Sequence, residues 1–171
     1  MTKPPRKTAI FTFDRRGWPN LYRHVSKQLD KGQLDKELHE LQLTGTRIKT
    51  TSDEAHFAKT LSLFSGIKTI VVKDMGLRNL DFLGEMLCTR FMTTKLVDIS
   101  CNSSLPRETI TAFIDILQGR SHTKEVPPIW LAIGNVPELF TENFDCCNPH
   151  VYGGCVCKQN ELFTLVRTCT L

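Results

Sequence analysis

The densest group of chemically capable side chains lies near the C-terminus. It consists of four thiols and one imidazole: Cys146, Cys147, His150, Cys155 and Cys157. Thiolate and imidazole are the ligands that Zn²⁺ prefers in tetrahedral sites. The spacing is irregular, however, because adjacent cysteines point apart in most backbones and Cys-x-Cys chelates one ion less readily than Cys-x2-Cys. We therefore expect reduced structural thiols in a C-terminal cap, with no metal and no cofactor. A zinc site and an oxidised pair are the alternatives.

The remaining cysteines and the termini indicate a reducing compartment. Seven cysteines cannot all pair within one chain, and Cys88, Cys101 and Cys169 are scattered as buried thiols usually are. The N-terminus is basic but lacks an apolar stretch of signal-peptide length, and no apolar run approaches the roughly 18–20 residues that span a bilayer. We expect an intracellular protein, cytoplasmic or nuclear, with no membrane contact.

No constellation of residues in the chain indicates catalysis. Phosphate-loop, dinucleotide-binding, nucleophile-elbow and HExxH motifs are all missing from the sequence. Asp14, Asp74 and Asp98 lie at or just after expected strand ends, but in different segments and at positions that favour turns. No mutual spacing relates the five histidines, which are His24, His39, His56, His122 and His150. We therefore expect that the protein is not an enzyme.

Composition favours one ordinary globular domain, or one domain with a tail. The 171 residues are 40% hydrophobic and 23% charged, which is neither disordered nor membrane-like. The formal net charge of +4 is mildly basic and does not by itself imply nucleic-acid binding.

Five short segments alternate apolar and other residues with the period of a β-strand. They span residues 9–14, 39–44, 68–73, 95–100 and 128–134. Each contains two apolar residues two positions apart, and these pairs superpose: Phe11/Phe13, Leu41/Leu43, Ile70/Val72, Val97/Ile99 and Leu131/Ile133. The first members are separated by 30, 29, 27 and 34 residues. Intervals this regular predict a structural repeat.

The segments between these strands have the pattern of amphipathic helices. In residues 108–117 an apolar stripe follows the helical period, with Pro106 before the first turn and Gly119 after the last. Residues 18–29, 52–64 and 79–91 repeat the pattern, with Ser52 and Asn79 as the expected N-caps of the last two.

Each unit is thus a strand, a turn, a helix and a return loop, which cannot bury its apolar faces alone. Stacking predicts an α/β fold: a short right-handed solenoid with a concave parallel sheet, convex helices and a C-terminal cap. We expect a flexible basic arm over 1–8, the solenoid over 9–140, and a Cys-rich cap with a C-terminal strand over 141–171. That strand, in 161–171, would either extend the sheet beyond Trp130 or pair with another chain.

The stretch "LVDISCNSSLPRETITAFIDIL" resembles a leucine-rich repeat of the ribonuclease-inhibitor-like type, whose repeats run to 28–30 residues. Its signature L-x-L-x-x-N-x-L is filled by Val97, Ile99, Asn102 and Ser104, with Leu105 one place late. The resemblance implies that the Asn102 side chain bonds neighbouring backbone where the chain leaves the strand. The other segments depart from the signature, with Thr46, Met75 and Val136 at the equivalent place.

If the superposed pairs face the core, the alternate residues face the concave side. There the second half of the sheet brings together an apolar group and two charges: Val71, Leu96, Trp130 and Ala132, with Lys73 and Asp98. An apolar patch centred on tryptophan and flanked by charges is typical of a protein-binding hot spot. We expect a non-catalytic adaptor or scaffold, a complex subunit that binds a partner protein through this face and the C-terminal edge. The alternative for Trp130 is that the C-terminal segment covers it.

The N-terminal segment "TKPPRKT" supports a second hypothesis, because it carries three positive charges. Such an arm adds non-specific phosphate affinity, although a strand face without aromatic platforms lacks base readout. An RNA-associated subunit, or the N-terminal module of an RNA-processing assembly, is therefore the alternative function, and the oligomeric state is open.

Overall fold

The computed structural model describes residues 4–12, 17–45, 47–118, 129–133, 155–159 and 163–167. Strands and helices alternate along most of this chain. The helices are α1 (Trp18–Asp30), α2 (Thr51–Leu61), α3 (Asp81–Thr89) and α4 (Arg107–Gln118). The strands are β1 (Thr8–Thr12), β2 (Glu37–Thr44), β3 (Gly66–Lys73), β4 (Leu96–Asp98), β5 (Ile129–Ala132), β6 (Cys155–Gln159) and β7 (Phe163–Arg167).

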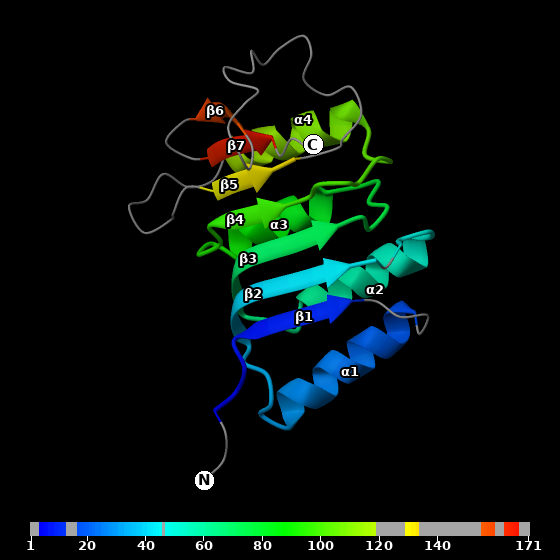
Figure 1. Cartoon of the computed structure of the whole chain (residues 1–171). Coiled ribbons are helices and arrows are strands. Elements are labelled where there is room, and N and C mark those ends of the chain that lie inside the picture. The colour runs from blue at the N-terminus through cyan, green and yellow to red at the C-terminus, as the bar shows by residue number, and fades with distance from the viewer. Residues whose placement is uncertain are drawn as a thin grey trace.

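All seven strands belong to one sheet, in the order β1-β2-β3-β4-β5-β7-β6. β1 to β5 pair in parallel, in the same order as in the sequence. Because crossovers between neighbouring parallel strands share one hand, the helices between them fall on one face of the sheet. Figure 1 shows α2, α3 and α4 on the same side, behind the strands. The α/β class and the alternation of strand and helix are therefore confirmed.

The register of the sheet reproduces most of the predicted superposition. Leu41 lies beside Ile70, Ile70 beside Val97, and Val97 beside Leu131. β1 differs, because Ala9 rather than Phe11 pairs with Leu41, and Phe11 pairs with Leu43. A shift of two residues leaves every side chain on the same face, so the alternation of β1 alone does not distinguish the two registers.

The core lies between the sheet and the helices. The inward residues of β2 to β5 are buried, with Leu41, Ile70, Val97 and Leu131 at 1% exposure or less. Large rings fill the space on the helix side: Trp18, Phe57, Phe64, Phe91 and Phe113. Burying each such ring stabilises the fold by about 1.5–3 kcal/mol, so the helices depend on this layer more than on their intrinsic propensities.

Two helix starts differ from the predicted caps. Thr50, not Ser52, is the N-cap of α2, and it forms a capping box with Asp53. The N-cap of α3 is Leu80, although the predicted cap, Asn79, still accepts a hydrogen bond from the Asp81 N–H at 2.7 Å. The observed caps therefore differ from the expected ones by one or two residues. Helix ends are commonly uncertain by this amount.

The C-terminal strand extends the sheet, which is one of the two alternatives that the sequence left open. β7 pairs in parallel with β5, with Trp130 beside Thr164. β6, which the sequence analysis did not predict, pairs antiparallel with β7 and forms the last strand of the described sheet. At the other end, Arg6 is bridged to Leu34 just before β1, so this part of the expected flexible arm is paired. None of the described helices is long and apolar enough to cross a membrane.

Candidate functional site

The six residues predicted to bind a partner lie on three neighbouring strands. Leu96 of β4 pairs with Trp130 of β5, and Asp98 of β4 lies between Val71 and Ala132. Lys73 continues β3 two residues beyond Val71. All six alternate with core residues, so they face away from the helices. We call this side of the sheet, which in β1 includes Ile10, the helix-free face.

Exposure divides the six residues into an outer and an inner group. Trp130 is 46% exposed, Leu96 is partly exposed, and the Lys73 side chain is 42% exposed. Val71, Asp98 and Ala132 are each less than 9% exposed and lie side by side on the same face. The surface available to a partner is thus formed by Trp130, Leu96 and Lys73, and the other three residues support it.

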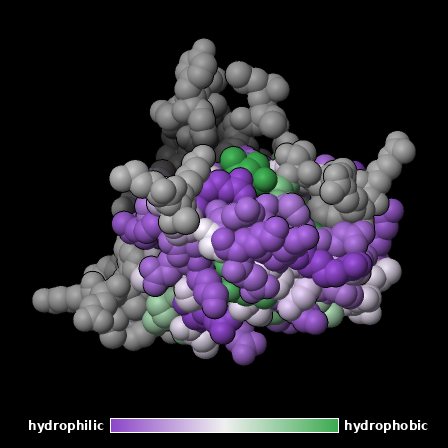
Figure 2. All heavy atoms as spheres, turned by 90° about the horizontal axis from the view of Figure 1, so that it is seen from below, coloured by the Kyte–Doolittle hydropathy of each residue, from purple (hydrophilic) through white to green (hydrophobic). Residues whose placement is uncertain are grey.

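Trp130 and Ile10 are the two large hydrophobic side chains recorded as exposed in the described part of the chain. Ile10 is on β1 and Trp130 on β5, so three strands separate them. Seen from below, toward the β1 end, the surface is mainly hydrophilic, with small hydrophobic spots (Figure 2). An exposed tryptophan buries far more apolar area on binding than a single isoleucine, which makes Trp130 the stronger candidate anchor.

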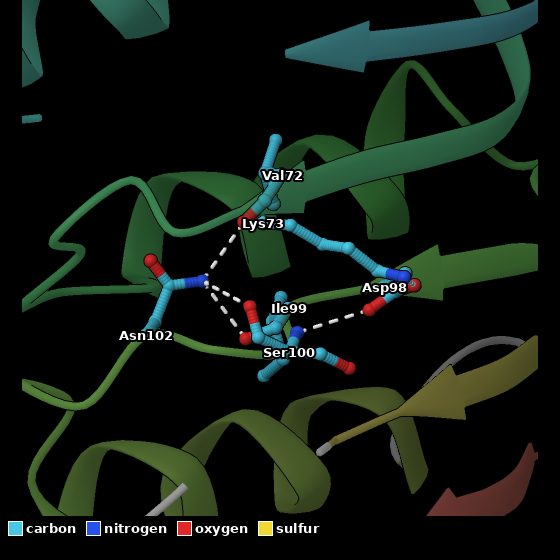
Figure 3. A network of polar contacts seen from close by, with 6 residues as sticks. All are labelled: Val72, Lys73, Asp98, Ile99, Ser100 and Asn102. Atoms are coloured by element: carbon cyan, nitrogen blue, oxygen red, sulfur yellow. Dashed lines mark hydrogen bonds and ion pairs between the residues drawn. The ribbon is translucent and has the colours of Figure 1, made fainter. Parts of the chain in front are cut away.

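An ion pair joins the two charged residues of the site. The Lys73 Nζ lies 2.9 Å from Oδ2 of Asp98, while Oδ1 of Asp98 accepts a hydrogen bond from the Ser100 N–H at 3.0 Å (Figure 3). Both oxygens of a nearly buried carboxylate therefore have partners, as the cost of desolvating a charge requires. The ion pair holds the Lys73 side chain next to β4, so Asp98 has a structural role.

Asn102 lies at the centre of a second polar network, at the end of β4. Its amide nitrogen donates to the carbonyl oxygens of Val72 and Ile99, both at 2.8 Å (Figure 3). Its amide oxygen accepts from the backbone N–H groups of Met75, at 2.9 Å, and Leu77, at 3.2 Å. The side chain is fully buried. The predicted role of Asn102, bonding neighbouring backbone where the chain leaves the strand, is confirmed.

The residues considered for chemistry are dispersed in the described part of the chain. His24 bonds Gln28, and His56 bonds the Ser52 carbonyl, both within their own helices. Asp74, at φ +49°, lies 3.6 Å from Arg47 in an exposed turn. Asp14, His122 and His150 lie outside the described residues.

The C-terminal cysteine cluster is described only in part. Cys155 and Cys157 belong to β6, whereas Cys146, Cys147 and Cys169 lie outside the described residues. Cys88 and Cys101 are not disulfide-bonded. No group of three or more possible metal ligands occurs among the residues that the structure describes.

Comparison with known proteins adds no relative. No family model, no curated protein and no solved structure matches the chain. The resemblance to leucine-rich repeats therefore stays a prediction, supported by the intervals between strands, the side of the sheet on which the helices lie, and the contacts of Asn102.

Proposed function

We propose that the chain is a non-catalytic adaptor, built as a short leucine-rich-repeat-like solenoid, that binds a partner protein through its helix-free face around Trp130. The observation that carries the proposal is the 46% exposure of Trp130 on β5, whose other residues are buried. Leaving a tryptophan half exposed on an ordered strand has a free-energy cost that a partner would remove.

The residues around Trp130 favour a binding interface over an isolated exposed side chain. Leu96 lies directly beside it on β4, and Val71 and Ala132 on the same face are buried. Lys73 provides a charge at the rim, fixed by Asp98 at 2.9 Å. An apolar centre with a charged rim is the usual anatomy of a specific protein interface.

A solenoid fold supports the placement of the binding surface on the helix-free face. In a sheet whose helices all lie on one side, the opposite side offers several parallel strands as one continuous surface. β7 lengthens this surface beyond Trp130, so the C-terminal edge is adjacent to the same site.

The test is affinity capture from native lysate with the full chain, comparing wild type with Trp130→Ala. We expect Trp130→Ala to lose a discrete set of captured proteins while thermal unfolding stays close to that of wild type. Ile10→Ala is the matched control, because Ile10 is an exposed apolar residue of the same face on a distant strand, and it should retain the set. Equal capture by wild type and Trp130→Ala would contradict the proposal.

Asp98 is a less suitable target, since it is nearly buried and bonds both Lys73 and Ser100. A lysine at this position would place two positive charges together and unfold the site, which would confuse loss of binding with loss of stability.

A further inference from the structure

A row of basic side chains crosses four strands at the end of the sheet opposite to Asn102. Lys7, His39, Lys68 and Lys95 occupy one register position, just before the paired core residues of β1 to β4. Backbone hydrogen bonds fix the row at both ends: the His39 N–H donates to the Lys7 carbonyl at 2.7 Å, and the Lys95 N–H to the Lys68 carbonyl at 2.8 Å. Neighbouring strands are about 4.8 Å apart, so the row spans about 14 Å.

These side chains lie at the starts of the strands, and three of them directly follow a residue that is buried. His39, Lys68 and Lys95 come after Leu38, Ile67 and Thr94, which are each 1% exposed or less, so they point away from the core. Each of the four lies two positions before a buried residue that is paired across the sheet: Ala9, Leu41, Ile70 or Val97. α2 ends at Leu61 and α3 at Thr89, before the chain turns back to the strand starts. Lys7, His39, Lys68 and Lys95 are all exposed. We call this row, together with the exposed Arg90, the basic edge.

A cavity of about 300 Å³ lies at the basic edge and is lined by three of its cations, Lys7, Lys68 and Arg90. His39 and the hydroxyl residues Ser65, Thr89 and Thr93 also line it. Arg90 donates to the carbonyl of Ser62, the C-cap of α2, where a cation offsets the partial negative charge of the helix end.

The positive charge at this edge is only partly balanced. Lys7 lies 3.9 Å from Asp35, and Glu37 lines the cavity. Within the described part of the chain, no ion pair engages Lys68 or Lys95. Holding like charges in register on neighbouring strands is unfavourable, which makes a bound anion stabilising.

We propose that the basic edge binds the phosphodiester backbone of a single-stranded nucleic acid without reading its bases. A straight row of cations matches a phosphodiester backbone, which carries a negative charge on every nucleotide. No Phe, Tyr or Trp is among the described residues that line the cavity, so base stacking has no platform there. A specific acidic peptide would need an apolar anchor, and the cavity offers only the partly exposed Met92 beside the buried Leu38.

The test is fluorescence anisotropy of the full chain with a labelled oligouridylate of about 12 nucleotides, a length within the usual range for single-strand sites. We expect the double variant Lys68→Glu/Lys95→Glu to bind about tenfold or more weaker. Its plot of log affinity against log salt should be shallower by about 1.4, because each lost phosphate contact removes about 0.7 on a single strand. An oligoadenylate should bind the wild type as tightly as the oligouridylate.

Lys49→Glu/Arg78→Glu is the matched control, since both residues are exposed, lie near the opposite ends of the strands, and give the same change in net charge. It should bind like the wild type. If the control weakens binding as much as the basic-edge variant, or if a polyglutamate peptide competes as well as the oligonucleotide at equal charge, the proposal is wrong. Far-ultraviolet circular dichroism would verify that both double variants are folded.

Discussion

Asn102 shows how one side chain joins two neighbouring segments of the chain. Its amide reaches the carbonyl of Val72 at the end of β3 and the N–H groups of Met75 and Leu77 in the following loop. It also bonds Ile99 of its own segment. The resemblance to leucine-rich repeats, in which Asn102 fills the signature after Val97 and Ile99, implied this role at the turn. The sequence could not predict which backbone groups pair with the amide, because that depends on how the loop after β3 lies against β4.

Replacing Asn102 with alanine should destabilise the protein by about 2–4 kcal/mol, because each buried backbone group left unpaired costs roughly 1–3 kcal/mol and relaxation recovers part of this. Urea unfolding followed by circular dichroism measures the change. Asn20→Ala is the control, because the Asn20 side chain accepts a hydrogen bond from Arg23 on the exposed surface of α1. It should change stability by about 0.5 kcal/mol or less. Similar losses for the two variants would show that the Asn102 network contributes little.

Trp130 marks the limit of prediction at the residue scale. The alternation of β5 places it on the helix-free face, but its exposure depends on where the C-terminal segment runs. The structure leaves it 46% exposed beside β7, which extends the sheet instead of closing over the ring. The alternating pattern of residues 161–171 predicts that they form a strand. Which existing strand it pairs with depends on the arrangement of the whole sheet.

At the scale of elements, the start of α2 is governed by a reciprocal cap. The Asp53 N–H donates to Oγ1 of Thr50 at 3.2 Å, while the Asp53 carboxylate accepts from the N–H groups of Lys49 and Thr50, each at 3.0 Å. Partial burial raises the pKa of Asp53. The hydrogen bonds from the Lys49 N–H and from Thr50 outweigh this, together with the nearby His56, and hold the pKa below its ordinary value of 3.8. Ser52 resembles a cap in sequence, but the residue three positions later is Ala55, whereas Thr50 has the acidic Asp53 there.

Asp53→Asn should therefore cost about 0.5–1 kcal/mol at pH 7, as for other lost caps. Since the folded pKa is depressed, the contribution of the carboxylate is present above the unfolded value of 3.8 and is lost as pH falls through the lower folded pKa. Urea unfolding of both proteins between neutral and acidic pH measures the difference. It should be constant down to about pH 5 and then shrink. A difference that persists unchanged at the lowest pH would contradict the assigned cause.

Strand register was the most predictable property of the elements. The basic edge follows from the same register but was not predicted. Apolar pairs two residues apart placed Ile70, Val97 and Leu131 side by side, as observed. The same register shows a basic residue two positions before each core residue: Lys7, His39, Lys68 and Lys95. The signal was missed because charges near loops are common at surfaces and gain meaning only when neighbouring strands align them. β1 was misplaced by two residues because its alternation fits either register.

At the scale of the whole molecule, one sheet presents two surfaces of different character. The helix-free face carries the exposed Trp130 and the partly exposed Leu96 beside buried residues, and the basic edge carries exposed cations at the starts of the strands. The two proposals can fail separately, since Trp130→Ala leaves the basic edge intact and Lys68→Glu/Lys95→Glu leaves Trp130 in place. Both surfaces follow from the parallel register of β1 to β5, because side chains at paired positions of neighbouring strands fall into rows.

The central claim is that the surface around Trp130 is covered by a partner protein. Hydroxyl-radical footprinting of the free chain and of the captured complex, read residue by residue in a mass spectrometer, tests it most directly. The core residue Trp18, 2% exposed, and the distant Ile10, 57% exposed, serve as internal references. We predict that oxidation of Trp130 falls severalfold in the complex while that of Trp18 stays low and that of Ile10 stays high. Oxidation of Trp130 at the same rate in the free chain and in the complex would contradict the account.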